Sequence, residues 1–136
     1  MNNIQTILDQ IDAFQPNERE WIDLEGLLDK LWETNDPEEG IDHLFGVFER
    51  FPEDDGEGVF WSIVHGIESL NNYESNLIDS LNRQPSHIGL VMVKRIQNSG
   101  QTKVANVKVI DVYKLIIDHK LAPTSVLLNA EKYLSE

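Results

Sequence analysis

The sequence predicts an all-α protein of about eight short antiparallel helices, arranged as a HEAT-like α-solenoid or as a compact helical bundle. Apolar residues recur at spacings of three and four along most of the chain, and short polar breaks separate the periodic segments. The strand–helix alternation of a parallel sheet is not visible. A length of 136 residues with ordinary apolar content predicts a single helical domain over residues 1–136.

Local signals bound each expected helix. Asn3, Asn17, Asp36 and Ser86 each precede a periodic segment and are expected to cap it, with Pro37 at the first position of the third helix. Asp36 and Glu39 have the spacing of a capping box. The expected helices span residues 4–14, 18–34, 37–51, 57–70, 73–82, 87–98, 103–119 and 124–134.

The segment 103–119 carries two conflicting signals. Its many β-branched residues favour a strand locally. However, Val107, Ile110, Lys114 and Ile117 advance by three and four, and the run is too long for a typical strand. We therefore predict a helix.

The charge is distributed unevenly along the chain. The net charge is −13, with 20 acidic and 3 basic residues in positions 1–80, against 4 acidic and 8 basic residues in positions 81–136. This balance argues against binding of nucleic acid or anionic lipid through the first half, and it favours a basic partner. A purely solubilising role for the acids is the alternative.

The sequence also indicates a compartment. The chain has no cysteine, which fits a reducing environment. The polar start Met1-Asn2-Asn3 is unlike a signal peptide, and no apolar stretch approaches the roughly 20 residues of a membrane span. We expect a cytoplasmic protein without membrane contact.

The stretch Glu53–Leu70 joins an acidic, glycine-containing loop to the most apolar helical segment. On a helical wheel its large aliphatic residues form a core face, while Trp61, His65 and Glu68 lie on one flank. His65 and Glu68 are three residues apart, so they can touch. Gly66 in mid-helix costs about 1 kcal/mol relative to alanine, which predicts the close approach of a neighbouring helix.

The pair of His65 and Glu68 allows two functional interpretations, half of a metal site or an acid–base pair. The alternative is a histidine oriented by a carboxylate at the edge of the core, which helps to seat Trp61. We favour this alternative because no second pair of ligands at metal spacing is present in the sequence.

Other motifs give weaker signals. The run Asp54–Gly58 lacks the alternating oxygen ligands and the distant glutamate of a calcium loop, and its glycines do not match a nucleotide fingerprint. We therefore predict no cofactor and no metal.

Ten acidic residues lie between positions 33 and 57, with Arg50 as the only base among them. Their mutual repulsion would be relieved by a cationic partner, although a solvated face also explains a charge run. The candidate partner-binding residues are Glu33, Asp36, Glu38, Glu39, Asp42, Glu49, Glu53, Asp54, Asp55 and Glu57.

The segment Gly58-Val59-Phe60-Trp61-Ser62-Ile63-Val64-His65-Gly66-Ile67-Glu68 resembles a group of small helical immunity proteins from bacterial polymorphic-toxin and contact-dependent growth-inhibition systems. The resemblance covers roughly positions 44–110, and within this range it includes further short stretches after the α-helical segment quoted above. These are Tyr73-Glu74, Leu81, Arg83, Pro85-Ser86, Leu90-Val91-Met92, Arg95 and Asn98.

This resemblance implies a non-enzymatic inhibitor. Such a protein binds the cognate toxin C-terminal domain encoded beside it, in the cytoplasm, as a monomer in a 1:1 complex. Those toxins are often nucleases with basic substrate grooves, which the acidic half of this chain would suit. The alternatives are an acidic adaptor or nucleic-acid mimic that binds several basic proteins, and a small metalloenzyme that uses His65 and Glu68.

Overall fold

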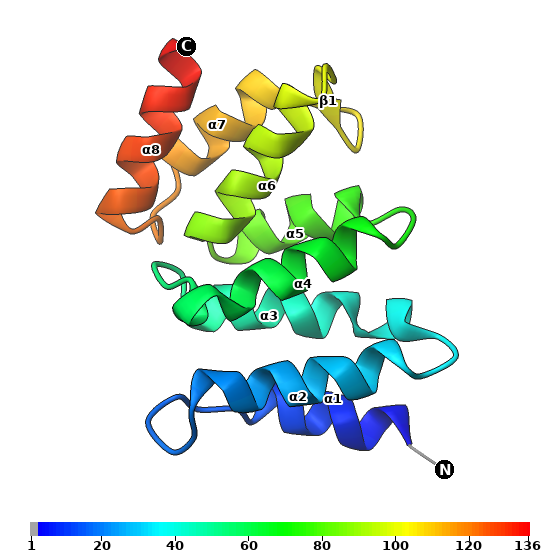
Figure 1. Ribbon diagram of the computed structural model, residues 1–136. Helices are drawn as coiled ribbons and strands as arrows, with labels where there is room; N and C mark the ends of the chain where they lie inside the picture. The colour runs from blue at the N-terminus through cyan, green and yellow to red at the C-terminus, as the bar shows by residue number, and fades with distance from the viewer. Residues whose placement is uncertain (1–2) are drawn as a thin grey trace.

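The computed structural model describes residues 3–136, so Met1 and Asn2 of the polar start lie outside the described residues. Over this range the chain forms eight α-helices, two short 3₁₀ helices and one two-stranded hairpin, which confirms the all-α prediction (Figure 1). The helices are α1 (Ile4–Asp12), α2 (Trp21–Trp32), α3 (Ile41–Arg50), α4 (Val59–Glu68), α5 (Glu74–Arg83), α6 (His87–Asn98), α7 (Val109–Ile117) and α8 (Thr124–Ser135).

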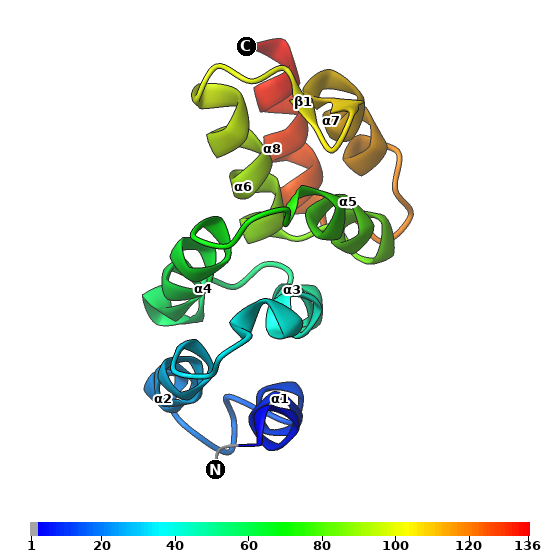
Figure 2. The ribbon, with the colours of Figure 1, turned by 90° about the vertical axis from the view of Figure 1, so that its right-hand side faces the viewer.

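Successive helix pairs stack along the molecule. Each odd-numbered helix packs against the next odd-numbered helix, so that α1, α3, α5 and α7 form one layer. In the other layer, α2 packs on α4 and α6 packs on α8 (Figure 2). The second layer breaks after α4, because α6 turns away from it and packs against α3, α5, α7 and α8. The short links produce the antiparallel neighbours that the sequence predicts.

An aromatic cluster holds the first two helix pairs together. The Trp21 ring lies 5.2 Å from the Phe60 ring and 5.4 Å from the Phe14 ring, measured between centroids. Phe48 continues the cluster at 5.3 Å from Phe60. All four side chains are buried, so this cluster joins α2, α3 and α4 to the residues that follow α1.

Two of the expected caps are confirmed. The Asn3 side chain accepts a hydrogen bond from the Gln5 backbone N–H at 2.9 Å and starts α1. The Ser86 hydroxyl accepts one from the Gly89 backbone N–H at 3.0 Å and starts α6. Both bonds satisfy donors that the first helical turn leaves without a partner.

The other two caps were predicted wrongly. Asn17 does not cap α2, which begins later, at Trp21, with a capping box between Glu20 and Asp23. The Asp36 side chain makes no capping hydrogen bond, and Pro37–Gly40 form a 3₁₀ helix, η1, before α3 begins.

The helix predicted over residues 103–119 is correct only in its second part. Residues 103–108 form a hairpin in which β1 (Lys103–Val104) pairs antiparallel with β2 (Val107–Lys108). Its two central residues, Ala105 and Asn106, have φ angles of 49° and 69°, as a tight primed turn requires. The hairpin contacts α5 and α6 and buries Val104.

Two arginine–glutamate pairs join the second and third helix pairs. The Arg83 guanidinium donates to both carboxylate oxygens of Glu49, at 3.0 and 2.9 Å, and links α5 to α3. Arg95 donates to both oxygens of Glu68 at 2.8 Å and links α6 to α4. The second bridge crosses the break in the even-numbered layer.

Replacing Arg95 by methionine is expected to lower the free energy of unfolding by about 1 kcal/mol. This value is at the upper end of the range for exposed ion pairs, because the hydrogen bonds to Glu68 are bidentate. The lost stacking of Arg95 near the Trp61 ring, at 5.9 Å, adds to the effect. Urea denaturation measures the change.

The control is Arg19→Met, which removes a 3.8 Å contact with Asp23 between two largely exposed side chains and a ring contact with Phe14 at 5.8 Å, comparable to that of Arg95 with Trp61, but no bidentate bridge. This control is expected to cost under about 0.5 kcal/mol. Equal losses for the two variants would show that the Arg95 bridge does not hold α6 to α4.

Candidate partner-binding surfaces

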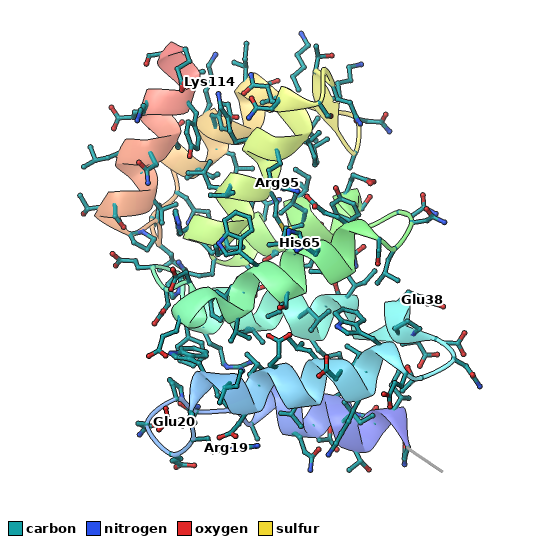
Figure 3. The ribbon with its side chains drawn as sticks, in the orientation of Figure 1. Arg19, Glu20, Glu38, His65, Arg95 and Lys114 are labelled. Atoms are coloured by element: carbon teal, nitrogen blue, oxygen red, sulfur yellow. The ribbon has the colours of Figure 1, made fainter. Side chains whose placement is uncertain are left out.

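The ten candidate acids do not form one patch. Five of them surround the connection from α2 to α3, where Figure 3 labels Glu38, and four lie in the loop between α3 and α4 at the opposite end of the helices. The ten residues of α3 separate the two groups by about 15 Å. The first group is Glu33, Asp36, Glu38, Glu39 and Asp42, and the second is Glu53, Asp54, Asp55 and Glu57.

Three of the candidate acids accept hydrogen bonds from side chains of other helices. Glu49, at the end of α3, accepts hydrogen bonds from Ser80 and Arg83. Asp42 accepts one from the Asn76 side chain at 2.7 Å, and Glu53 accepts one from the Ser125 hydroxyl at 2.8 Å. These carboxylates stabilise contacts between helix pairs, which sequence spacing alone did not indicate.

Asp54 and Asp55 shape their own loop. Their carboxylates accept hydrogen bonds from the backbone N–H groups of Gly56 and Glu57 at 2.9 and 3.0 Å. Gly56, Glu57 and Gly58 all have positive φ angles, of 61°, 54° and 92°. A left-handed run of this kind favours glycine, so the loop is a turn built by its aspartates.

Arg50 leaves the acids around it largely uncompensated. Its guanidinium turns inward and donates to the Ile11 carbonyl at 3.0 Å. Burial lowers the pKa of Arg50, and the nearby carboxylates of Asp12 and Glu49 act in the opposite direction. The one base of the predicted acidic set therefore has a structural position.

Two acids outside the predicted set belong to an earlier loop. Glu18 and Glu20 lie in the connection between α1 and α2, at the same end of the helices as the α3–α4 loop, and Figure 3 labels Glu20 there. Gly56 packs close to the Trp21 ring, which brings the two loops together. The periodic pattern of α2 and the buried Trp21 were the only signals for this proximity.

In the described residues, Glu68 does not orient His65, although their spacing would allow it. Glu68 turns towards α6, where Arg95 takes both of its oxygens, and these hydrogen bonds raise the pKa of Arg95. His65 is exposed, and its ring centroid lies 6.3 Å from that of Trp61. The Trp61 ring is also contacted by the Arg95 guanidinium, at 5.9 Å, and Figure 3 labels His65 and Arg95.

Within residues 3–136, no group of three or more histidine or acidic side chains is placed to hold a metal ion. None of the helices in this range combines the length and apolarity needed to cross a bilayer.

A hollow of about 520 Å³ lies between α2 and α4 on the even-numbered layer. Side chains of both helices line it, and at one end it reaches η1 and the residues beyond α4. The lining residues are Glu25, Asp29, Trp32, Pro37, Ser62, His65, Gly66, Ser69 and Leu70.

The floor of this α2–α4 groove confirms the prediction made from Gly66. A Cβ atom at Gly66 would collide with the six-membered ring of Trp32, so the glycine lets the indole lie directly against α4. The Ser62 hydroxyl donates to Glu25 across the same gap at 3.0 Å. Close approach of the two helices thus depends on small residues along α4.

A second hollow, of about 660 Å³, lies beside the α3–α4 loop. Phe51, Pro52, Glu53, Asp54, Asp55 and His87 line it. Each of its three carboxylates accepts one of the internal hydrogen bonds described above, as Glu25 does in the α2–α4 groove, but this hollow lacks an indole.

The described residues thus present two acidic ends and, between them, a groove with an indole and two carboxylates. These features suit binding of a cationic protein surface. Comparison with protein-family models, with curated proteins and with solved structures finds no significant match to this chain.

Proposed function

We propose that this protein is an immunity protein, which binds and neutralises a cognate bacterial toxin domain in the cytoplasm without catalysing a reaction. The segregation of charge along the stack carries the proposal. Positions 1–80 hold 20 acids and only 3 bases, and two of those bases, Arg19 and Arg50, already contact groups of the same chain. A basic partner would relieve the repulsion among the remaining carboxylates.

The partner that suits this surface is a compact domain with a basic groove, such as a nuclease. The exposed acids at both ends of α2 and α3 would meet its cationic rim, and a 1:1 complex would cover that groove. The resemblance of the α4 segment to immunity proteins supports the same proposal. Association is expected to be fast and to weaken steeply with salt.

The test is co-expression with the C-terminal domain of the protein encoded immediately upstream. The chain should restore the growth of cells that make this domain, and the purified pair should form a 1:1 complex. Loss of growth despite good expression of the chain would contradict the proposal. Similar affinity for several unrelated basic proteins would instead support an acidic adaptor or a nucleic-acid mimic.

Charge reversal identifies which acidic end meets the toxin domain. Glu38→Lys with Glu39→Lys changes the end near η1, and Glu18→Lys with Glu57→Lys changes the opposite end. At least one pair is expected to weaken binding about a hundredfold and to reduce its salt dependence. Isothermal titration at two salt concentrations measures both quantities.

The matched control makes the same change in net charge elsewhere, with Asp118→Lys and Glu131→Lys in the basic half. It should change the affinity less than threefold. If all three pairs weaken binding equally, net charge rather than a defined acidic surface governs association, and the proposed interface is wrong.

A further inference from the structure

We propose that the α2–α4 groove is the anchoring site for an arginine side chain of the protein partner. This inference deepens the proposed function, because it assigns the contact to a specific place on the acidic half. It uses three features of the groove: an aromatic floor, flanking carboxylates, and a neighbouring stretch of α2 where an exposed glycine has no side chain.

The aromatic floor is the indole of Trp32, which is half-buried and lines the hollow. A guanidinium group stacks favourably on an indole, and tryptophan is the strongest aromatic partner for cations. Because Gly66 holds the ring against α4, the indole has little freedom to move, so binding costs little ordering entropy.

The carboxylates come from the same side of α2. Glu25 and Asp29 are four residues apart and therefore neighbours on the helix. Ser62 donates to one oxygen of Glu25, which orients the carboxylate and leaves its second oxygen available. Among the described residues, no lysine or arginine lines the hollow, so a cation supplied by a partner would balance the negative charge of Glu25 and Asp29.

Beside the groove, the exposed surface of α2 contains a glycine and an apolar side chain. Gly26 is exposed in mid-helix, and a Cβ there would meet nothing within 4 Å in residues 3–136, so no contact in this range accounts for a glycine. Its cost of about 1 kcal/mol relative to alanine would be offset if a partner backbone approached α2 closely. Ile22, one turn away and 67% exposed, would then be covered.

An arginine fits these features better than a lysine. The planar guanidinium can stack on Trp32 while its N–H groups reach Glu25 and Asp29 together, whereas an ammonium is a compact point charge that is more strongly hydrated. The groove also reaches Pro37, beside Glu38, so further basic residues of the partner would meet the acidic end there.

The first experiment titrates the full chain with N-acetyl-arginine amide and follows the indole N–H signals of its tryptophans by NMR. We expect a saturable shift at Trp32, with Trp21 and Trp61 unaffected. N-acetyl-lysine amide should bind at least threefold more weakly, and the uncharged N-acetyl-citrulline amide should produce no shift. Equal binding of citrulline amide, or no shift at Trp32, would overturn the proposal.

Paired variants separate the groove from the general acidic field. Glu25→Gln with Asp29→Asn should weaken arginine amide binding at least fivefold. Glu38→Gln with Glu39→Gln removes the same charge outside the groove and should change it less than twofold. Equal losses in the two variants would show that the ligand responds only to net charge.

The same variants distinguish this inference from the proposed function. If the upstream-encoded domain binds and the groove variant binds it as tightly as the unmodified chain, the groove assignment is wrong and the immunity function stands. If arginine amide binds at Trp32 but the upstream-encoded domain does not bind, the groove assignment stands and the immunity function is wrong.

Discussion

Phe60→Ala is expected to lower the free energy of unfolding by about 4 kcal/mol, because truncating a fully buried phenylalanine loses transfer free energy and leaves a cavity. Phe60 connects Trp21 to Phe48, with ring centroids 5.2 and 5.3 Å away, so no single neighbour can move in to fill the space. Domains of this kind have about 5–15 kcal/mol of stability in total.

The measurement is urea denaturation followed by circular dichroism, with Phe60→Leu as the control. Leucine keeps most of the apolar volume and is expected to cost under about 1.5 kcal/mol. A loss below about 1 kcal/mol for Phe60→Ala would show that the aromatic cluster does not hold the first two helix pairs together.

Gly66→Ala is expected to destabilise the protein by about 2 kcal/mol, although alanine favours helix. Its methyl group would collide with the Trp32 ring, so that α2 and α4 must separate or the indole must leave its rotamer. Overpacking of this kind costs about 1–3 kcal/mol, and the loss of close packing between the two helices adds to it. The gain in helix propensity, about 1 kcal/mol, offsets only part of the cost.

Gly26→Ala provides the matched control, since it is the same substitution in mid-helix on the partner helix, but with open space around it. It is expected to stabilise the protein by about 0.5–1 kcal/mol. In a Trp32→Ala background, Gly66→Ala should become stabilising as well, because the colliding ring is gone. Destabilisation by Gly66→Ala that persists in this background would contradict the clash.

Most of the helical architecture could be predicted because it is encoded locally. Periodic apolar spacing and the caps at Asn3 and Ser86 correctly located the helices around them. The errors occurred where two local solutions competed. Near α2, the capping box of Glu20 and Asp23 formed instead of an Asn17 cap, which shortened the helix.

The hairpin before α7 shows a second kind of failure. Val107 continues the helical spacing that leads into α7, so the pattern gave no boundary at this point. The turn that makes the boundary needs positive φ at Ala105 and Asn106, and alanine gives no sign of such a conformation. Burial of Val104 against α5 and α6 compensates for the strain, and this is a tertiary effect.

The candidate site depended more strongly on contacts between distant residues. Spacing suggested that His65 would meet Glu68, but Arg95, from another helix, claims the carboxylate. Proximity in sequence also suggested a single acidic patch over positions 33–57, whereas the length of α3 divides it. The α2–α4 groove joins residues up to 45 positions apart, and only Gly66 gave a local sign of it.

The opposite charges at the two ends of the helix stack have a consequence for motion in solution. With an excess of acids in the first 80 residues and of bases in the remainder, the molecule has a large electric dipole along its length. A charged partner exerts a torque on such a dipole before any contact forms, within roughly a Debye length of 8 Å at physiological salt. Encounters would therefore begin with the acidic first half of the chain already turned towards the cationic surface, which shortens the rotational search.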